Sequence, residues 1–117
     1  MICFSNDTDR KSFRNAIEFS RLDWQLISRI LPALQEEMQG LGTNMVITSV
    51  WREKSTDHRA YRSVDVRVWN LEPADRKRVE ARINERFPVL LGERPTIKYY
   101  HPGNSSYPQH FHVRVPE

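Results

Sequence analysis

Apolar side chains recur at every fourth position along the first long segment of the chain, and this spacing gathers them on one face of a helix. Ser20, with Asp23 three residues later, resembles a capping box at its start, and Gly40 is placed to end it. Pro32 lies in the helix interior, where a proline removes a backbone hydrogen bond and costs about 3 kcal/mol. We therefore predict a core-facing helix with a kink or a break in the turn before this proline. The apolar positions are Leu22, Leu26, Ile27, Ile30, Leu31, Leu34 and Met38.

Two later segments have the period of two that is typical of β-strands. Over residues 64–69, valines alternate with other side chains, so Asp65 falls on the polar face of its strand. Over residues 110–115, apolar side chains alternate with polar ones, so His110 and His112 share one face. The sequence therefore predicts two strands whose polar faces carry side chains of the types that bind metals.

A second helix is predicted to begin at Pro73, where a proline is tolerated because the N–H that it lacks would be unpaired in a first turn. Val79, Ile83 and Phe87 follow at four-residue spacing among charged side chains, which indicates a surface helix with one narrow apolar seam. Pro88 is expected to end this helix.

The order of the predicted elements is helix, strand, strand, helix, strand, strand. Residues 43–51 are rich in β-branched side chains and predict a buried strand, and residues 95–100 predict a further one. Residues 1–19 give little signal. We predict a single α+β domain over residues 1–117, with helices packed on a small antiparallel sheet.

Composition limits the chain to one core and restricts its chemistry. With 117 residues, of which 38% are apolar, the chain can bury one core but is too short for two ordinary domains. Cys3 is the only cysteine, which excludes an intrachain disulfide and a zinc ribbon.

Charge and hydropathy favour a soluble protein. The net charge of +3 is spread along the chain and gives mild attraction to anionic polymers such as nucleic acid or bacterial cell wall. No segment approaches the roughly 20 apolar residues that span a bilayer, and the N-terminus lacks the apolar run of a signal peptide. We therefore expect synthesis in the cytoplasm and no membrane segment.

His58 and Asp65, seven positions apart, could form a metal site together with a histidine of the C-terminal strand. Zinc takes nitrogen and oxygen ligands, and a catalytic site supplies three of them and leaves a fourth position for water. The spacing requires a loop ligand folded back beside a strand ligand, which the local pattern permits. The alternative is a solvated loop histidine, an aspartate paired with Arg62 or Arg67, and two histidines on an exposed strand face.

Three motifs follow one another along the chain. They are Thr48-Ser49-Val50-Trp51-Arg52, then Thr56-x-His58-x-x-x-x-Ser63-x-Asp65, and then His110-x-His112-Val113. In order and spacing this set resembles the D-alanyl-D-alanine carboxypeptidase and hedgehog-like family of zinc peptidases, which includes bacterial cell-wall peptidases and phage endolysins. The resemblance covers residues 43–116 and implies the α+β fold of that family and a zinc ion in the active site.

The resemblance implies roles for five side chains. His58, Asp65 and His112 match the zinc ligands of the family. Arg52 matches the arginine thought to hold the substrate or to stabilise the developing oxyanion. His110, one side chain along the same strand face, could assist proton transfer or orient the site.

The chain also departs from the family pattern. Tyr61 and Ser63 replace a glycine and an alanine of the second motif, so the loop around His58 must be shaped differently. Gln109 stands three residues before the last ligand, where the family has the Asp or Glu that serves as general base, and a glutamine cannot accept a proton at neutral pH. The nearest carboxylates in sequence that could replace it are Glu53, Asp57 and Glu93.

The motifs predict zinc-dependent hydrolysis of an amide bond in the peptides of bacterial peptidoglycan. Bound zinc lowers the pKa of its water toward neutrality and polarises a carbonyl, which is the basis of metal-assisted hydrolysis. Without a signal peptide, such an enzyme would fit a phage lysin released by a separate pore, or an intracellular wall-recycling enzyme.

Two other functions remain open. One is a non-catalytic, zinc-containing binding module for peptidoglycan peptides or a protein partner. The other is a nuclease that cuts single-stranded DNA with a tyrosine, because such enzymes also carry a His-x-His metal motif on a strand, and Tyr99, Tyr100 and Trp51 would suit nucleic acid. Their tyrosine follows that strand, where only residues 113–117 remain here, so nucleic acid is the least favoured partner.

Overall fold

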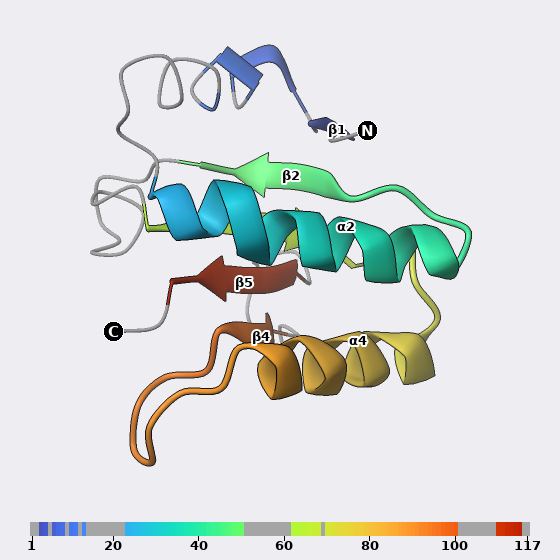
Figure 1. The fold of residues 1–117 in the computed structure, drawn as a ribbon. Helices are drawn as coiled ribbons and strands as arrows, with labels where there is room; N and C mark the ends of the chain where they lie inside the picture. Colours follow the sequence, from blue (N-terminus) through green and yellow to red (C-terminus); the bar gives the residue numbers. More distant parts are fainter. Residues whose placement is uncertain are drawn as a thin grey trace.

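Among the residues that the structure describes, five strands form one sheet that carries two helices on one face (Figure 1). The computed structural model describes residues 3–4, 6–8, 10–11, 13, 23–50, 62–68, 70–100 and 110–115. The strands are β1 (Cys3–Phe4), β2 (Val46–Ser49), β3 (Ser63–Arg67), β4 (Ile97–Tyr100) and β5 (His110–Arg114). The helices are the π-helical turn η1 (Leu26–Ile30), which continues into α2 (Leu31–Gly40), and α4 (Pro73–Arg86).

The strands lie in the order β1-β2-β3-β5-β4 across the sheet. The pairs β2 with β3, β3 with β5 and β5 with β4 are antiparallel, as predicted, but β1 pairs parallel with β2. The α+β class is thereby confirmed, whereas the prediction of a purely antiparallel sheet is wrong at this edge. The helix between β1 and β2 explains the difference, because it returns the chain to the end of the sheet where β1 began.

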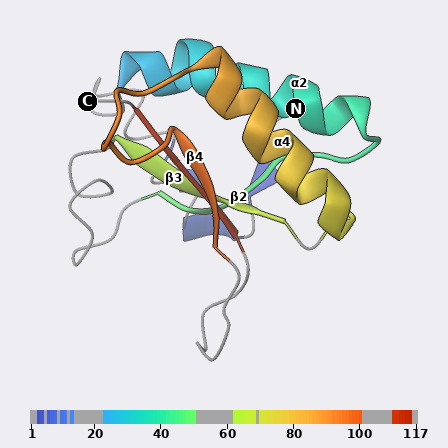
Figure 2. The same cartoon turned by 90° about the horizontal axis from the view of Figure 1, so that it is seen from below.

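The core lies between the helices and one face of the sheet. Figure 2 shows α2 and α4 on the same side of the strands. Of the predicted apolar stripe, Leu22 lies outside the described residues and Ile27 is only partly buried. The fully buried helical side chains are Leu26, Ile30, Leu31, Leu34, Met38, Val79 and Ile83. The sheet contributes Ile47, Val64, Val66, Ile97, Phe111 and Val113.

Pro32 widens the helix and does not break it. The chain stays helical from Trp24 to Gly40, with η1 immediately before the proline. Leu31 N–H donates to Leu26 O, five residues back, in place of the usual four. A proline ring crowds the carbonyl four residues before it, and a wider turn relieves that contact. The disturbance lies where it was predicted, near Ile30 and Leu31, but it is a π-helical turn and not a break in the helix.

Asp23 caps the start of this helix through its side chain. Gln25 N–H donates to Asp23 Oδ1 at 2.9 Å, which satisfies one of the backbone donors that a helix leaves unpaired at its first turn. Ser20, the predicted cap, lies outside the described residues.

Gly42, and not the predicted Gly40, provides the stop signal of α2. Thr43 N–H donates to Met38 O at 3.1 Å and Gly42 N–H donates to Gln39 O at 3.0 Å, which is the pattern of a Schellman motif. That motif requires a left-handed residue after the helix, and Gly42 has a φ of 78°. Gly40 is the last helical residue.

The two glycines are expected to respond in opposite directions to alanine. Gly42→Ala should lower the free energy of unfolding by about 1 to 2 kcal/mol, because an L-residue is strained at positive φ. Gly40→Ala should raise it by about 0.5 to 1 kcal/mol, because alanine favours the helix. At neither position would a new Cβ meet another atom within 4 Å, so the backbone alone decides the sign. Urea unfolding of both variants measures the effect, and equal shifts would contradict the motif.

Helix α4 follows its prediction closely. It begins at Pro73 and ends at Arg86, immediately before Phe87 and Pro88. Val79 and Ile83 are buried, and Phe87 packs against the core while partly exposed.

Two side chains of α4 also bind the outer edge of β4. Asn84 Oδ1 accepts a hydrogen bond from Ile97 N–H at 3.0 Å, and Asn84 Nδ2 donates to Ile97 O at 2.9 Å. The carboxylate of Glu80 accepts a hydrogen bond from Tyr99 N–H. The distance between Glu80 and Asn84 along the helix matches the distance between their partners along the strand. Four helical residues rise by about 6 Å, and two strand residues span about 6.8 Å. Helix α4 therefore satisfies backbone groups that another strand would otherwise bind.

Candidate functional site

The candidate site lies on the face of the sheet that points away from the helices. In the pairing of β3 with β5, Asp65 lies opposite His112 and Arg67 lies opposite His110. Because side chains alternate along a strand, these four residues share one face, while the apolar residues between them face the core. The register thus joins the aspartate of the second motif to both histidines of the third.

The three predicted site residues that the structure describes lie within a few ångströms of one another. His112 Nδ1 is 3.1 Å from Asp65 Oδ1, at hydrogen-bond distance, and His110 Nε2 is 3.8 Å from the same oxygen. Asp65 is buried, with 1% of its side chain exposed, and the two histidines expose 16% and 17% of theirs. The predicted juxtaposition of Asp65 with the C-terminal histidines is confirmed.

The separation of Asp65 and His112 is compatible with two ligands of one metal ion. Two ligand atoms bound to one tetrahedral zinc lie about 3.3 Å apart, and the two distances at Asp65 Oδ1 lie on either side of that value. Carboxylate oxygen and imidazole nitrogen are also ligands that zinc accepts. Within the described part of the chain, no three His, Cys, Asp or Glu side chains form a group that could hold a metal ion. His58, the predicted third ligand, and Arg52 lie outside the described residues.

The polar face of β3 and β5 is largely buried. Ser63, Asp65 and Arg114 expose 0%, 1% and 2% of their surface, so the alternative of an exposed polar face is wrong at its centre. Arg62, one of the two arginines considered as partners of Asp65, has a nitrogen 3.8 Å from a carboxylate oxygen of Asp23. Alternation in sequence distinguishes the two faces of a strand but carries no information on what covers the second face.

A bulge in β2 places Ser49, a motif residue to which the sequence assigned no role, beside Asp65. Ile47 pairs with Val66 and Ser49 pairs with Asp65, which leaves Thr48 as an extra residue. The bulge lets both Ile47 and Val50 enter the core, although they are three residues apart, and puts Ser49 beside Asp65. A bulge depends on the partner strand, so the sequence pattern of β2 alone does not reveal it.

Lys98 extends the same line of residues on the other side. It pairs with His112 in the register of β4 with β5. Ser49, Asp65, His112 and Lys98 therefore form a row across four strands, which we call the site row. Ser49 and Asp65 are buried, His112 is partly exposed and Lys98 is exposed, so the row opens toward β4.

Ser63→Ala is expected to raise the free energy of unfolding by about 1 kcal/mol. Ser63 is fully buried and its hydroxyl has no hydrogen-bond partner, so the native state carries an uncompensated desolvation penalty. Alanine is also the residue that the resembled family has here. Urea denaturation measures the change, with Ser28→Ala, an exposed helical serine, as the control. A clear loss of stability in Ser63→Ala would mean that the hydroxyl has a partner.

The residues considered at the position of the general base are not placed beside Asp65 in the described part of the chain. Gln109, Glu53 and Asp57 lie outside the described residues. Glu93 lies in the turn before β4, where its N–H donates to Leu90 O at 3.0 Å. One carboxylate oxygen of Glu93 is buried without a hydrogen-bond partner, and nothing in the described residues ties it to Asp65.

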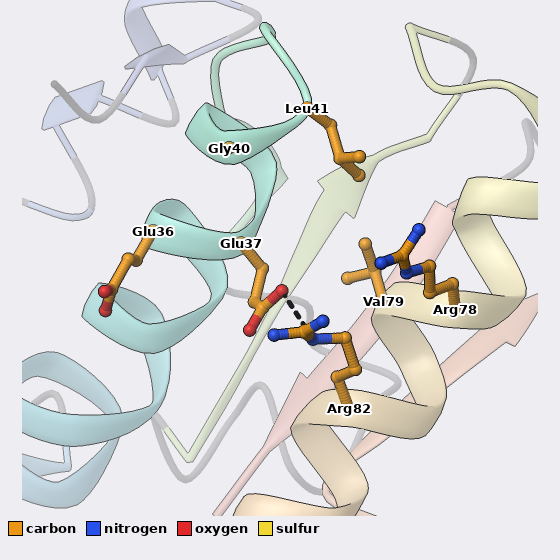
Figure 3. Close-up of a pocket in the computed structure, with 7 residues that line it drawn as sticks. All are labelled: Glu36, Glu37, Gly40, Leu41, Arg78, Val79 and Arg82. Carbon is orange, nitrogen blue, oxygen red and sulfur yellow. Dashed lines mark ion pairs between the residues drawn. The ribbon is translucent and has the colours of Figure 1, made fainter.

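A separate hollow lies between the helices, on the other side of the sheet (Figure 3). It has a volume of about 370 Å³, and Glu37 of α2 and Arg82 of α4 point toward each other across it, with 2.9 Å between Oε2 and Nε. Its walls carry charges of both signs that neutralise each other. It lacks histidine and a buried carboxylate, so the site row has the stronger chemistry.

Comparisons of the chain with protein-family models, with curated proteins and with solved structures gave no match. The resemblance to zinc peptidases therefore stays a prediction from the motifs. No helix among the described residues is long and apolar enough to cross a membrane.

Proposed function

We propose that this protein is a zinc-dependent hydrolase that cleaves an amide bond in the peptides of bacterial cell wall, with a fold like that of the hedgehog and D-alanyl-D-alanine carboxypeptidase family. The supporting observation is the buried carboxylate of Asp65, held 3.1 Å from His112 and 3.8 Å from His110 on the neighbouring strand. The motif order along the chain adds to it, because Asp65 and His112 match two of the three zinc ligands of the resembled family.

A buried carboxylate needs compensation by a positive charge or by hydrogen bonds. Beside Asp65 on the strand face lie two imidazoles, His112 at 3.1 Å and His110 at 3.8 Å, and imidazole nitrogen can also bind a metal. Burying such a cluster has a desolvation penalty, and apolar side chains of similar volume would stabilise a sheet face as well without that penalty. Its presence in the centre of the sheet therefore favours a functional role.

In the proposed enzyme, Asp65, His112 and His58 hold the zinc ion. A bound zinc ion would polarise the substrate carbonyl and would activate a water molecule. Arg52 holds the substrate or stabilises the oxyanion. His110 would assist proton transfer or orient the site, since Gln109 cannot act as the general base.

A non-catalytic zinc module is the second candidate, and Gln109 is the observation that favours it. Such a protein would keep Asp65, His112 and the metal but would have no group that takes the proton. The two functions share the metal site and differ only in turnover.

The test is the release of free amino groups from purified peptidoglycan by protein purified without an affinity tag. We expect release that stops with a chelator and returns with added zinc. Zinc binding and wall binding without release would replace the enzyme with the binding module. Nicking of single-stranded DNA with covalent attachment through a tyrosine would replace both.

A further inference from the structure

A second hollow between the helices lies where the end of α4 meets the first turns of the other helix. Figure 2 shows these two helix ends close together, on the opposite side of the sheet from Asp65 and His112. The hollow has a volume of about 440 Å³, which is in the range of small-molecule sites. Its walls include Arg29 of η1 and both Arg86 and Phe87 at the end of α4. The proposed function does not use it.

Two arginines converge on one aromatic ring in this hollow. The Cζ atom of Arg29 lies 5.8 Å from the centroid of the Phe87 ring, and that of Arg86 lies 5.7 Å from it. In the described part of the chain, neither guanidinium group forms an ion pair or a hydrogen bond. Arg82, by contrast, is paired with Glu37 at 2.9 Å. The two like charges are therefore held near each other with only the face of a ring as their common partner.

The π-helical turn before Pro32 supplies one of the two cations. Such turns are rare and are frequent at functional sites, and Arg29 belongs to this one. A cation in the last turn of a helix also stabilises the helix dipole, which accounts for Arg86 at the end of α4. It does not account for Arg29, which comes from a different helix and lies over the same ring.

We propose that this hollow binds a phosphoryl group between Arg29 and Arg86, either as free phosphate or as the phosphate ester of a small molecule. A phosphate monoester carries close to two negative charges at neutral pH and offers three strong acceptor oxygens. Guanidinium groups match such oxygens in a bidentate manner, so two arginines can share one phosphoryl group. Phe87, Pro32 and Ala33 provide apolar walls for the organic part of an ester.

Glu36 also lines the hollow and gives the inference a test of sign. Its side chain is exposed on α2, and among the described residues it forms no ion pair with either arginine. A carboxylate there repels a bound anion, so Glu36→Gln should bind the phosphoryl group about twofold more tightly. Arg29→Gln and Arg86→Gln should each bind it about fivefold more weakly, because each removes one cation that contacts it.

Binding is measured by NMR titration of the zinc-free full-length chain at about pH 8, where histidine is largely neutral. Zinc is removed because it also accepts oxygen ligands. The probes are ribose 5-phosphate, ribose and inorganic phosphate. The ring signals of Phe87 and the amide signal of Arg29 should move with the two phosphates and not with ribose, while the signals of His112 should stay in place. Tighter binding of ribose 5-phosphate would identify an ester as the ligand, and equal binding would identify free phosphate.

Arg78→Gln is the matched control, because Arg78 is exposed on the same helix and lines the first hollow (Figure 3). Its affinity for the phosphates should equal that of wild type. Unchanged affinity in both Arg29→Gln and Arg86→Gln, weaker binding in Glu36→Gln, or equally tight binding of acetate would overturn the inference. The inference does not depend on the proposed function, because the titration requires neither zinc nor turnover.

Discussion

Asp65→Ala is expected to reduce the affinity of the protein for zinc by at least about 100-fold, since loss of even an outer partner of a metal ligand costs 10- to 100-fold. Wild-type protein purified without an affinity tag should contain about one zinc per chain, and the variant should contain almost none. The reason is that the carboxylate of Asp65 lies 3.1 Å from His112 and 3.8 Å from His110. Elemental mass spectrometry measures the metal directly.

Two further variants separate charge from shape at this position. Asp65→Asn keeps the size and some hydrogen bonding but removes the negative charge, and we expect it to lose most of the zinc as well. Asp7→Ala removes a carboxylate whose side chain is 78% exposed, and its zinc content should equal that of wild type. Zinc should raise the melting temperature of wild type and of Asp7→Ala only, because a ligand stabilises the state that binds it. Full zinc content in folded Asp65→Ala would remove the proposed ligand.

Asn84→Leu is expected to lower the free energy of unfolding by about 2 to 4 kcal/mol. Asn84 both accepts from Ile97 N–H and donates to Ile97 O, so leucine would leave two backbone groups of β4 without their partner. A part-buried donor or acceptor without a partner keeps its desolvation penalty, which is larger than the net gain of one hydrogen bond. Chemical denaturation of the zinc-free protein measures the loss.

Asn84→Asp provides the matched comparison. It keeps the acceptor for Ile97 N–H and loses the donor to Ile97 O, so it should cost less than leucine does. Glu85→Ala, at the exposed neighbouring position of α4, should change stability by less than about 0.5 kcal/mol. Equal stability of Asn84→Leu and Glu85→Ala would show that the edge of β4 does not depend on this side chain.

Local patterns along the chain predicted most of the individual elements. The four-residue spacing of Val79 and Ile83 identified the buried seam of α4, and Pro73 marked its first turn. Alternation of valines identified β3 and β5, whose apolar residues are all buried. These features depend on periodicity within one segment, which a sequence displays directly.

Features that depend on two distant segments were not predictable in this way. The parallel pairing of β1 with β2 involves two residues with no periodicity of their own, Cys3 and Phe4. The bulge at Thr48 exists only relative to β3. Two glycines close together also made the helix stop ambiguous. Gly40 and Gly42 both follow the apolar stripe, and only the backbone angles identify Gly42 as the stop signal.

In the candidate site, too, some features followed from the sequence motifs and others depended on strand pairing. The sequence motifs grouped Asp65 with His112 and His110, and the register of β3 with β5 brings them together. The burial of Asp65 did not follow from its place on the polar face of a strand, because alternation does not show what covers that face. Ser49 stood in the first motif without a role and Lys98 stood in no motif, and strand pairing alone puts them in line with Asp65 and His112.

The hydrogen bonds from α4 to β4 have a consequence for misfolding. An edge strand with unpaired backbone groups is a template for the strand of another molecule, and here Asn84 and Glu80 occupy those groups at Ile97 and Tyr99. Fraying of α4 would expose them while the rest of the sheet is still folded. Self-association of this protein should therefore begin with partial melting of one helix, on the opposite side of the sheet from the face that carries Asp65 and His112.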